Sequence, residues 1–379
     1  MSRVRRAELE SARCVHGCTG TPGERTRRIM IAIIAKHTCV CRQKAHRDLW
    51  KMLSAAVPFW ALCFLSAGLA HAVEQISGNY SLVLVGGGLN DDNTEANSDP
   101  EVEAHVRTLT GFFFGGGDQL RIIESFYNKN ARVPSPVLQT IREQLLRTGG
   151  VVAGTSAGTD CQTSSVMITG GESYQGLVKG ATIFWEPVER KDPNLLTGYG
   201  PGGIGLFEHG LIDTHFANRG RQGRLVKLLL DSMDLPHGHR RSFGVDENTA
   251  LVVTGDWKTR RGEVLGQRGV WVFDVESAVQ SDGDVIGVAV SRISRGDGID
   301  LHTLSIQPAS YKLLLLETNP EVETSKDIFG ADVFEFDKIS LSLLQSTQGM
   351  TTGVTAQSPQ IKRVRLSAGQ SGASILRCW

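Results

Sequence analysis

The stretch that decides the fold is VVAGTSAG (151–158). An apolar, partly β-branched run leads directly into Gly-Thr-Ser-Ala-Gly, which predicts a buried strand that ends in a tight turn. The pattern Gly-x-Ser-x-Gly is typical of a serine nucleophile held on a sharp strand-to-helix turn. A serine at such a place is also a common helix N-cap, so the surrounding sequence must decide between the two roles.

Similar strands lie on both sides of this stretch. SLVLVGGGL (81–89) and GFFFGGGDQ (111–119) are apolar runs that end in glycine, and GLIDTHF (210–216) and GVDENTALVVTG (244–255) follow later. Amphipathic segments between them predict helices, of which 135–148 is the clearest. Strands that alternate with helices indicate an α/β fold with a mostly parallel sheet, in which ligands bind at the carboxyl ends of the strands.

Three of the predicted strands end in polar residues. The first ends in Ser156, the second in Asp213 and His215, and the third in Asp246 and Glu247. A serine, a histidine and a carboxylate that meet at one edge of a sheet are the groups that nucleophilic acyl transfer needs. Since the histidine must be neutral to act as a base, we expect hydrolysis to fall as the pH drops through the pKa of His215.

A basic cluster follows the candidate histidine. Arg219, Arg221 and Arg224 stand at the start of a predicted helix. Guanidinium groups bind carboxylates in a bidentate manner, and a helix start favours anions. A solvated helix face is the ordinary interpretation of such a run. Its place directly after His215 favours binding of substrate carboxylates.

Taken together, these motifs resemble the cyanophycinase and peptidase E family of serine peptidases. FFFGGGDQLR, AGTSAG, DTHFANRGRQGRL and GVDENTA occur in the order and rough spacing of that family, over about 110–255. The resemblance implies a flavodoxin-like α/β fold, a mostly parallel sheet flanked by helices, similar to class I glutamine amidotransferases. It also implies hydrolysis of cyanophycin, a poly-aspartate that carries arginine on each β-carboxyl, to β-aspartyl-arginine dipeptides.

The resemblance assigns roles to single residues. Ser156 would be the nucleophile, His215 the general base and Glu247 the group that orients the histidine, although Asp246 stands beside it. The backbone N–H groups that would form the oxyanion hole belong to Gly116, Gly117 and Ala157. The residues that would bind the substrate are Gln119, Asp213, Thr214, Arg219, Arg221 and Arg224. This mechanism needs no metal and no organic cofactor.

The chain departs from the family pattern in three places. Thr214 stands where cyanophycinases typically have glutamine, and Thr159 stands where alanine is usual. The glycine-rich ends at 86–89 and 111–116 are separated only by residues 90–110, where family members have a longer segment. Either the sheet is shortened, with an exposed edge or a lost dimer contact, or the gene model lacks a segment. A homodimer is therefore an open expectation.

The sequence predicts four regions. Residues 1–51 form a basic leader that is untranslated if Met30 or Met52 is the true start. Residues 52–72 resemble a secretory signal that ends in Ala70-His71-Ala72, rather than a membrane anchor, and place the protein outside the cell or in the periplasm. The peptidase domain spans 73–339. The Ser-, Thr- and Gln-rich residues 340–379 are expected to form a loose tail.

Composition excludes some classes of protein and allows one disulfide. Lysine plus arginine and aspartate plus glutamate each number 40, so the net charge of zero argues against a non-specific nucleic-acid binder. Only Cys161 and Cys378 follow the predicted signal, and they can pair in an oxidising compartment.

Two other functions fit the same residues. The first is an aspartyl or isoaspartyl dipeptidase on the same scaffold. The second is a catalytically inactive binding protein, which the short segment before residue 111 favours and the intact Ser156, His215 and Glu247 disfavour. A glutamine amidotransferase would have cysteine in place of Ser156.

Overall fold

The computed structural model describes most of residues 96–355, with short gaps, and several strands that lie before or after this range in the sequence. The described residues are 30–35, 82–85, 96–127, 132–186, 192–256, 259–281, 284–313, 319–348, 350–355, 363–368 and 374–378. The predicted signal over 52–72 and most of the leader over 1–51 lie outside them, so both stay predictions.

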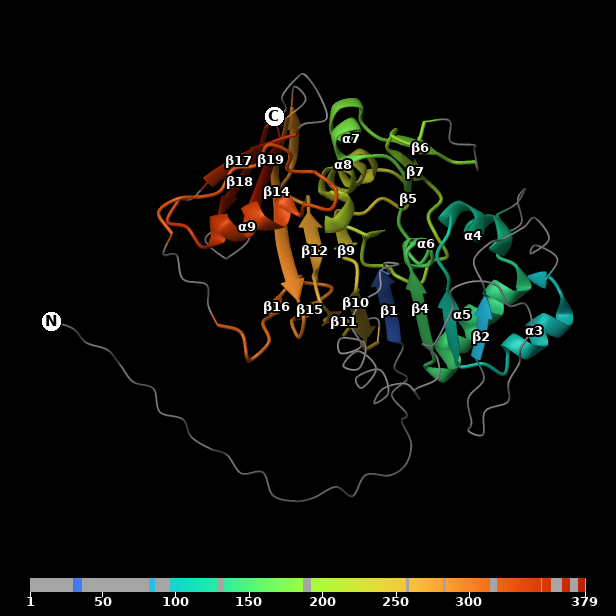
Figure 1. Cartoon of the computed structure of the whole chain (residues 1–379). Coiled ribbons are helices and arrows are strands. Elements are labelled where there is room, and N and C mark those ends of the chain that lie inside the picture. Colours follow the sequence, from blue (N-terminus) through green and yellow to red (C-terminus); the bar gives the residue numbers. More distant parts are fainter. Residues whose placement is uncertain are drawn as a thin grey trace, which may run out of the picture.

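The first sheet has eight strands, drawn across the lower part of Figure 1. They are β1 Met30–Ala35, β2 Leu82–Val85, β3 Gly111–Phe114, β4 Val151–Thr155, β10 Thr249–Thr254, β11 Arg261–Gly266, β15 Gly298–Asp300 and β16 Ile306–Gln307. Their order is β16-β15-β11-β10-β1-β4-β3-β2. Strands β1 to β4 run parallel to one another, and the remaining neighbours are antiparallel.

The second sheet contains eight further strands. They are β8 Leu211–Thr214, β9 Arg241–Val245, β12 Gly269–Asp274, β13 Val279–Ser281, β14 Asp284–Ser294, β17 Met350–Val354, β18 Arg363–Ala368 and β19 Ser374–Cys378. The order is β17-β18-β19-β14-β12-β9-β8, and β13 pairs with β14. Only β8 and β9 are a parallel pair among these described strands.

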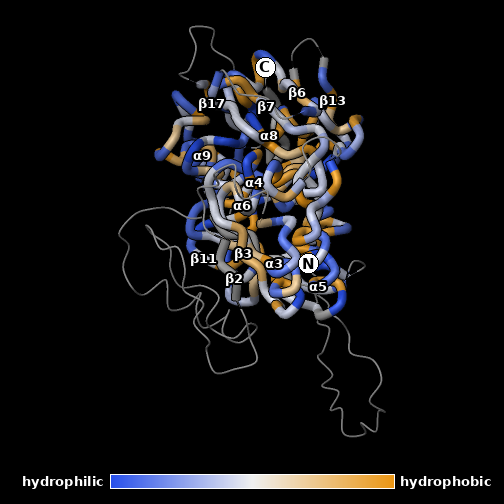
Figure 2. The backbone as a smooth tube through the Cα atoms, turned by 90° about the vertical axis from the view of Figure 1, so that its right-hand side faces the viewer, coloured by the Kyte–Doolittle hydropathy of each residue, from blue (hydrophilic) through white to orange (hydrophobic). Residues whose placement is uncertain are grey.

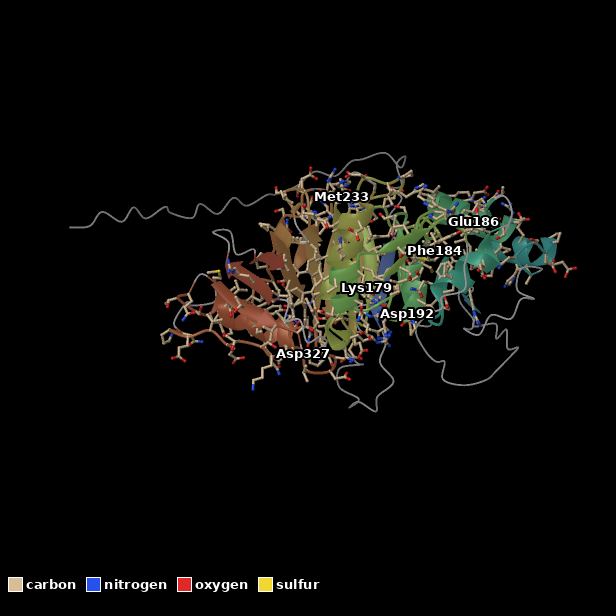
Figure 3. All side chains as sticks on the ribbon, turned by 90° about the horizontal axis from the view of Figure 1, so that it is seen from above. Lys179, Phe184, Glu186, Asp192, Met233 and Asp327 are labelled. Carbon is tan, nitrogen blue, oxygen red and sulfur yellow. The ribbon has the colours of Figure 1, made fainter. Side chains whose placement is uncertain are left out.

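Helices and a small third sheet complete the fold. The helices are α3 Pro100–Val106, α4 Gln119–Phe126, α5 Pro136–Thr148, α6 Ala157–Asp160, α7 Ser173–Lys179, α8 Gln222–Ser232 and α9 Glu335–Leu344, with the 3-10 turn η2 Ala217–Arg219. The third sheet joins β5 Met167–Gly170, β7 Thr197–Tyr199 and β6 Thr182–Phe184. Figure 3 marks Lys179 at the end of α7 and Phe184 at the end of β6. In the described part of the chain, no helix has the length and apolar character to cross a membrane.

Strand β12 shows how the layers pack. Val270 and Val272 point into the core shared with the first sheet, whereas Trp271 and Phe273 point into the core shared with α8 and α9. The two faces alternate because successive side chains of a strand point in opposite directions. The second sheet is therefore the middle layer, buried on both faces, and Figure 2 shows apolar segments concentrated in the interior.

The α/β class is confirmed, but the mostly parallel sheet is wrong. Parallel neighbours need a long crossover connection, whereas short loops produce antiparallel pairs. The crossovers through α4 and α5 keep β3 and β4 parallel, while the short loops after β10 and β12 reverse the chain. The predicted strand over 244–255 is in fact two strands, β9 and β10, one in each sheet.

Both ends of the chain contribute strands that the sequence did not predict. Strand β1 lies within the leader and pairs with β4 and β10. The loose tail is wrong, because β17, β18 and β19 extend the second sheet from β14. Cys161 is buried and has a free thiol, so the disulfide with Cys378 is not formed.

The C-terminal strands can be tested by a core substitution. Leu366 on β18 is fully buried, so Leu366→Ala should lower the free energy of unfolding by about 2–5 kcal/mol. Leu341 on α9 is 49% exposed, and Leu341→Ala is the matched control with a much smaller expected effect. Urea unfolding of the two variants measures the difference. Equal stabilities would mean that β18 is not part of the folded core.

Candidate active site

Ser156 occupies a strained turn between β4 and α6. Its backbone angles are φ 54° and ψ −124°, a conformation that is rare for residues other than glycine. Within the described chain its side chain forms no capping hydrogen bond to α6. The hydroxyl lies instead 2.8 Å from Nε2 of His215. The geometry therefore argues against the N-cap role.

The two glycines of the pattern allow this turn to pack tightly. A Cβ on Gly158 would lie 2.1 Å from the carbonyl oxygen of Phe114, and a Cβ on Gly154 would lie 2.1 Å from the carbonyl oxygen of Gly158. No side chain fits at either place. Glycine is thus required on both sides of Ser156 by close backbone approach.

His215 and Glu247 come from neighbouring parallel strands. Thr214, the last residue of β8, is opposite Val245, the last residue of β9. The residues that follow β8 and β9 therefore lie close together at the same end of the two strands. The Nδ1 of His215 lies 2.7 Å from Oε1 of Glu247, and the two side chains are buried.

The three side chains meet across two sheets rather than along one. Ser156 follows β4 of the first sheet, whereas His215 and Glu247 follow strands of the second sheet. The sequence predicted that these strand ends converge, and they do. The edge on which they converge is formed where the two sheets pack against each other.

The environment of His215 favours the neutral ring. Burial lowers its pKa, and the nearby Arg219 and Arg221 lower it further, while the hydrogen bond to Glu247 opposes the shift. A neutral imidazole whose Nδ1–H donates to Glu247 has its Nε2 lone pair free to accept the hydroxyl proton of Ser156. This is the protonation state that a general base requires.

The neighbouring acids Asp246 and Glu247 have different contacts in the structure. The carboxylate of Asp246 accepts hydrogen bonds from the backbone N–H groups of Ala217 at 3.0 Å and Gly269 at 3.1 Å. Burial, with repulsion from Asp337, raises its pKa to about 7. Glu247, not Asp246, contacts the histidine.

The predicted oxyanion groups lie around Ser156. A Cβ on Gly116 would lie 3.2 Å from Cβ of Ser156, so this backbone passes directly beside the serine. Gly117 is exposed, and no described heavy atom lies within 4 Å of the position where its Cβ would be. Ala157 begins α6, and the first N–H groups of a helix have no partner within the helix. These N–H groups are candidates to bind a developing oxyanion.

Three of the predicted substrate-binding residues bind one another. Asp213 is completely buried and accepts hydrogen bonds from Arg224 at 2.6 and 2.8 Å and from Arg221 at 3.1 Å. Burial opposes the charge, but the two guanidinium groups hold the pKa of Asp213 below its usual value. Burial beside Arg224 lowers the pKa of Arg221 to about 10. This ion-pair cluster lies directly before His215 in the chain.

The other predicted substrate residues are placed differently. The amide of Gln119 donates to the carbonyl oxygen of Ile168 at 2.7 Å. Thr214 is buried, and its hydroxyl donates to Asp160 at 3.3 Å. Arg219 is exposed at the end of η2 and forms no ion pair with the described residues. Of the three arginines, Arg219 is the one that a substrate reaches without breaking an ion pair.

Asp160 is a residue that the sequence reasoning missed. It is 4% exposed, and its Oδ1 has no hydrogen-bond partner among the described residues. Burial raises its pKa to about 8, and repulsion from Asp213 adds to the shift. The sequence feature that could have identified it is an acidic residue in the first turn after Ser156, directly after Thr159.

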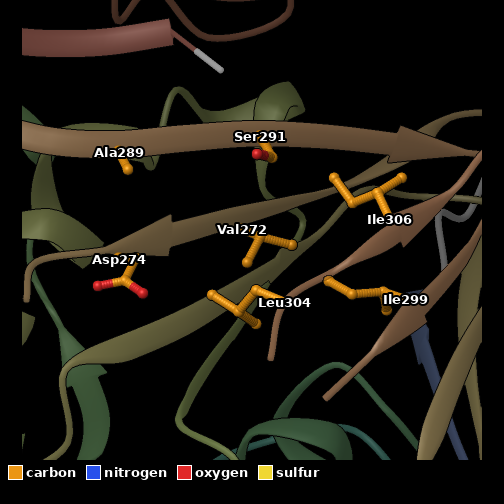
Figure 4. Close-up of a pocket in the computed structure, with 7 residues that line it drawn as sticks. All are labelled: Val272, Asp274, Ala289, Ser291, Ile299, Leu304 and Ile306. Atoms are coloured by element: carbon orange, nitrogen blue, oxygen red, sulfur yellow. The ribbon is translucent and has the colours of Figure 1, made fainter. Parts of the chain in front are cut away.

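A cavity of about 180 Å³ lies away from these residues. It is lined by Val272, Asp274, Ala289, Ser291, Ile299, Leu304 and Ile306, which Figure 4 shows between the strands. None of the candidate catalytic residues lines it. Among the described residues, no group of three or more His, Cys, Asp or Glu side chains is arranged to hold a metal ion.

The chain is similar to curated cyanophycinases. It is 26% identical to the cyanophycinases of Nostoc sp. and Trichormus variabilis over 223 residues, 56% of this chain and 64% of theirs. It is also 26% identical to that of Synechococcus elongatus over 216 residues, 55% of this chain and 58% of the relative. These similarities confirm the resemblance that the motifs indicated.

The chain thus spans less than two thirds of the length of these relatives. No family model matches it. A crystal structure of a peptidase from an acI-B1 Actinobacterium aligns with 73% of this chain and 98% of its own, at 16% identity and a TM-score of 0.40.

The raised pKa of Asp160 gives a prediction for stability. Its pKa is near 3.8 in the unfolded chain and about 8 in the fold, so folding takes up a proton between these pH values. The stability of the parent therefore falls as the pH rises from 5 to 8, while Asp160→Asn does not titrate. We expect the melting temperature of the variant, relative to the parent, to increase over this range.

The control is Asp192→Asn, since Asp192 is exposed. Its melting temperature relative to the parent should stay constant with pH. A constant difference for Asp160→Asn as well would contradict the raised pKa.

Proposed function

We propose that this relative of the cyanophycinases is a serine peptidase that hydrolyses cyanophycin to β-aspartyl-arginine dipeptides. The observation that supports it most is the continuous contact from Ser156 through His215 to Glu247, at 2.8 and 2.7 Å. Serine, neutral imidazole and a buried carboxylate in this order can activate a hydroxyl for acyl transfer. The similarity to cyanophycinases supports the choice of substrate.

The proposed reaction proceeds in two halves. His215 accepts the proton of Ser156 as its oxygen attacks the aspartyl carbonyl, and Glu247 stabilises the resulting imidazolium. The N–H groups of Ala157 and of Gly116 or Gly117 bind the oxyanion. His215 then returns the proton to the leaving amine, and an acyl-enzyme forms. Water, activated by the same histidine, releases the acyl group and restores the serine.

Substrate selection is proposed to begin at Arg219. Its guanidinium is exposed beside His215 and suits the free carboxylates of an aspartyl substrate. Arg221, Arg224 and Asp213 would act together as the buried wall behind it, because their charges are already paired. Thr214, which stands where cyanophycinases typically have glutamine, belongs to the same wall through its hydrogen bond to Asp160.

We also propose a flavodoxin-like fold and export for this protein. The parallel strands β2, β3, β4 and β1 with their crossover helices support a flavodoxin-like arrangement similar to class I glutamine amidotransferases. The apolar segment that ends in Ala70-His71-Ala72 supports export to the periplasm or medium. A homodimer stays a proposal for the assembly.

The dipeptidase is the second candidate. Pairing of Arg221 and Arg224 with Asp213 favours it, since it leaves fewer cations for a polymer. An inactive binding homologue is disfavoured by the strained turn at Ser156, because strain of this kind persists where a function needs it.

The substrate is tested by release of β-aspartyl-arginine from insoluble cyanophycin. The full chain should be used, because β1 lies between β4 and β10. We expect release by the parent and a loss of about 10³-fold or more in Ser156→Ala. Cleavage of short aspartyl peptides without release from the polymer would identify the dipeptidase, and no activity on either would contradict the peptidase.

The neighbouring acids Asp246 and Glu247 form a matched pair of variants. Glu247→Gln removes the charge that holds the histidine and should lower kcat by about 10³-fold or more. Asp246→Asn changes a group that faces backbone N–H groups and should lower kcat by less than about 10-fold, although it destabilises the fold. The reverse order in the folded variants would assign the orienting role to Asp246.

Export is tested by the N-terminus of the protein recovered from the periplasm or medium. A mature chain that begins at Val73 would support the signal over 52–72. Such a chain lacks β1, so the first sheet would then form without the strand between β4 and β10. A protein that keeps residues 30–35 and stays in the cytoplasm would contradict export.

A further inference from the structure

We propose that a histidine–arginine cluster at the far end of β8 and β9 binds a small oxyanion. The cluster consists of His209, His239, Arg241, Arg260 and His302. His209 and His239 precede β8 and β9, and Arg241 is the first residue of β9. Arg260 precedes β11, and His302 follows β15. His215 and Glu247 instead follow β8 and β9, at the opposite end of these strands. The site is therefore separate from the candidate active site and independent of the proposed peptidase function.

Contacts hold the cluster together. The rings of His209 and His302 meet edge to face, with centroids 5.1 Å apart. Arg241 donates to the backbone carbonyl of His302 at 2.6 Å. The carbonyl of Arg260 accepts from the N–H of Leu301, the residue before His302, at 3.1 Å.

Two buried nitrogen atoms in this cluster lack partners. His209 and Arg260 are each 8% exposed. Nε2 of His209 and Nη1 of Arg260 form no hydrogen bond with any described residue. Buried polar atoms are nearly always hydrogen-bonded, and an unmet donor costs about 1–3 kcal/mol. Nη1 of Arg260 carries hydrogen atoms in every protonation state, and Nε2 of His209 donates in one of the two neutral tautomers of the ring. An acceptor placed between the two side chains would therefore satisfy both nitrogens.

The charge balance points to an anion. Asp274 lies 3.5 Å from Arg241, and Asp300 accepts from the backbone N–H groups of His302 and Thr303. Arg260 forms no ion pair with a carboxylate in the described part of the chain. Burial, together with repulsion from Arg260 and His302, lowers the pKa of His209 to about 4. A metal cation would be repelled by the two arginines, whereas an oxyanion would relieve the repulsion.

The cluster is open on one side. His302 is exposed, and His239 and Arg241 are half-buried. Asp274, the partner of Arg241, also lines the cavity of about 180 Å³ and stands at one end of it in Figure 4. A guanidinium fork with imidazole N–H donors suits the oxygens of a phosphate or a carboxylate.

The test is the melting temperature of the full chain at pH 7 with inorganic phosphate, with acetate, or with sodium chloride at the same ionic strength. We expect a saturable increase with phosphate or acetate over chloride. An increase with phosphate alone identifies a phosphate site, and an increase with both identifies a general oxyanion site. No increase over chloride with either anion would overturn the proposal.

Single substitutions test whether the increase in melting temperature arises from this cluster. His302→Ala changes an exposed side chain and should lose most of the shift, as should Arg260→Gln. The control is His105→Ala, an exposed histidine on α3, which should keep the full shift. An unchanged shift in folded His302→Ala protein would also overturn the proposal.

Discussion

The hydrogen bond between Ser156 and His215 depends on the packing of two sheets. The serine follows β4 of the first sheet, and the histidine follows β8 of the second. The distance of 2.8 Å is kept only while both sheets share one apolar core, to which Val152 of β4 and Ile212 of β8 contribute. The geometry of the candidate site is thus a consequence of tertiary packing rather than of one rigid element.

Local patterns predicted the site better than they predicted the sheets. The glycines around Ser156, the polar strand ends and the helix predicted over 135–148 are all properties of short segments. The structure has that helix as Pro136–Thr148, with Ser135 as its N-cap. Strand partners depend on contacts between distant segments, which periodicity does not encode. This is why β1 and the strands after residue 349 were missed. The pairing of Asp213 with Arg224 was missed for the same reason.

Buried charges are concentrated beside the candidate site. Asp213 is ionised because two guanidinium groups compensate for its burial, whereas Asp160, with less compensation, is driven toward the neutral form. The carboxyl groups of Asp160 and Asp213 interact with each other and with the arginines, so all of them titrate as one unit. Thr214 joins this unit to His215 through the backbone. Two of the three departures of this chain from the family pattern belong to this region, because Thr159 precedes Asp160 and Thr214 follows Asp213.

The most direct test of the central claim is labelling of Ser156 by a fluorophosphonate, located by peptide mass spectrometry. An activated serine beside a neutral histidine reacts, whereas an ordinary serine does not. The account predicts a single labelled peptide that contains Ser156 in the parent protein and no labelling in His215→Ala. A folded parent protein that remains unlabelled, or one labelled equally in His215→Ala, would contradict it.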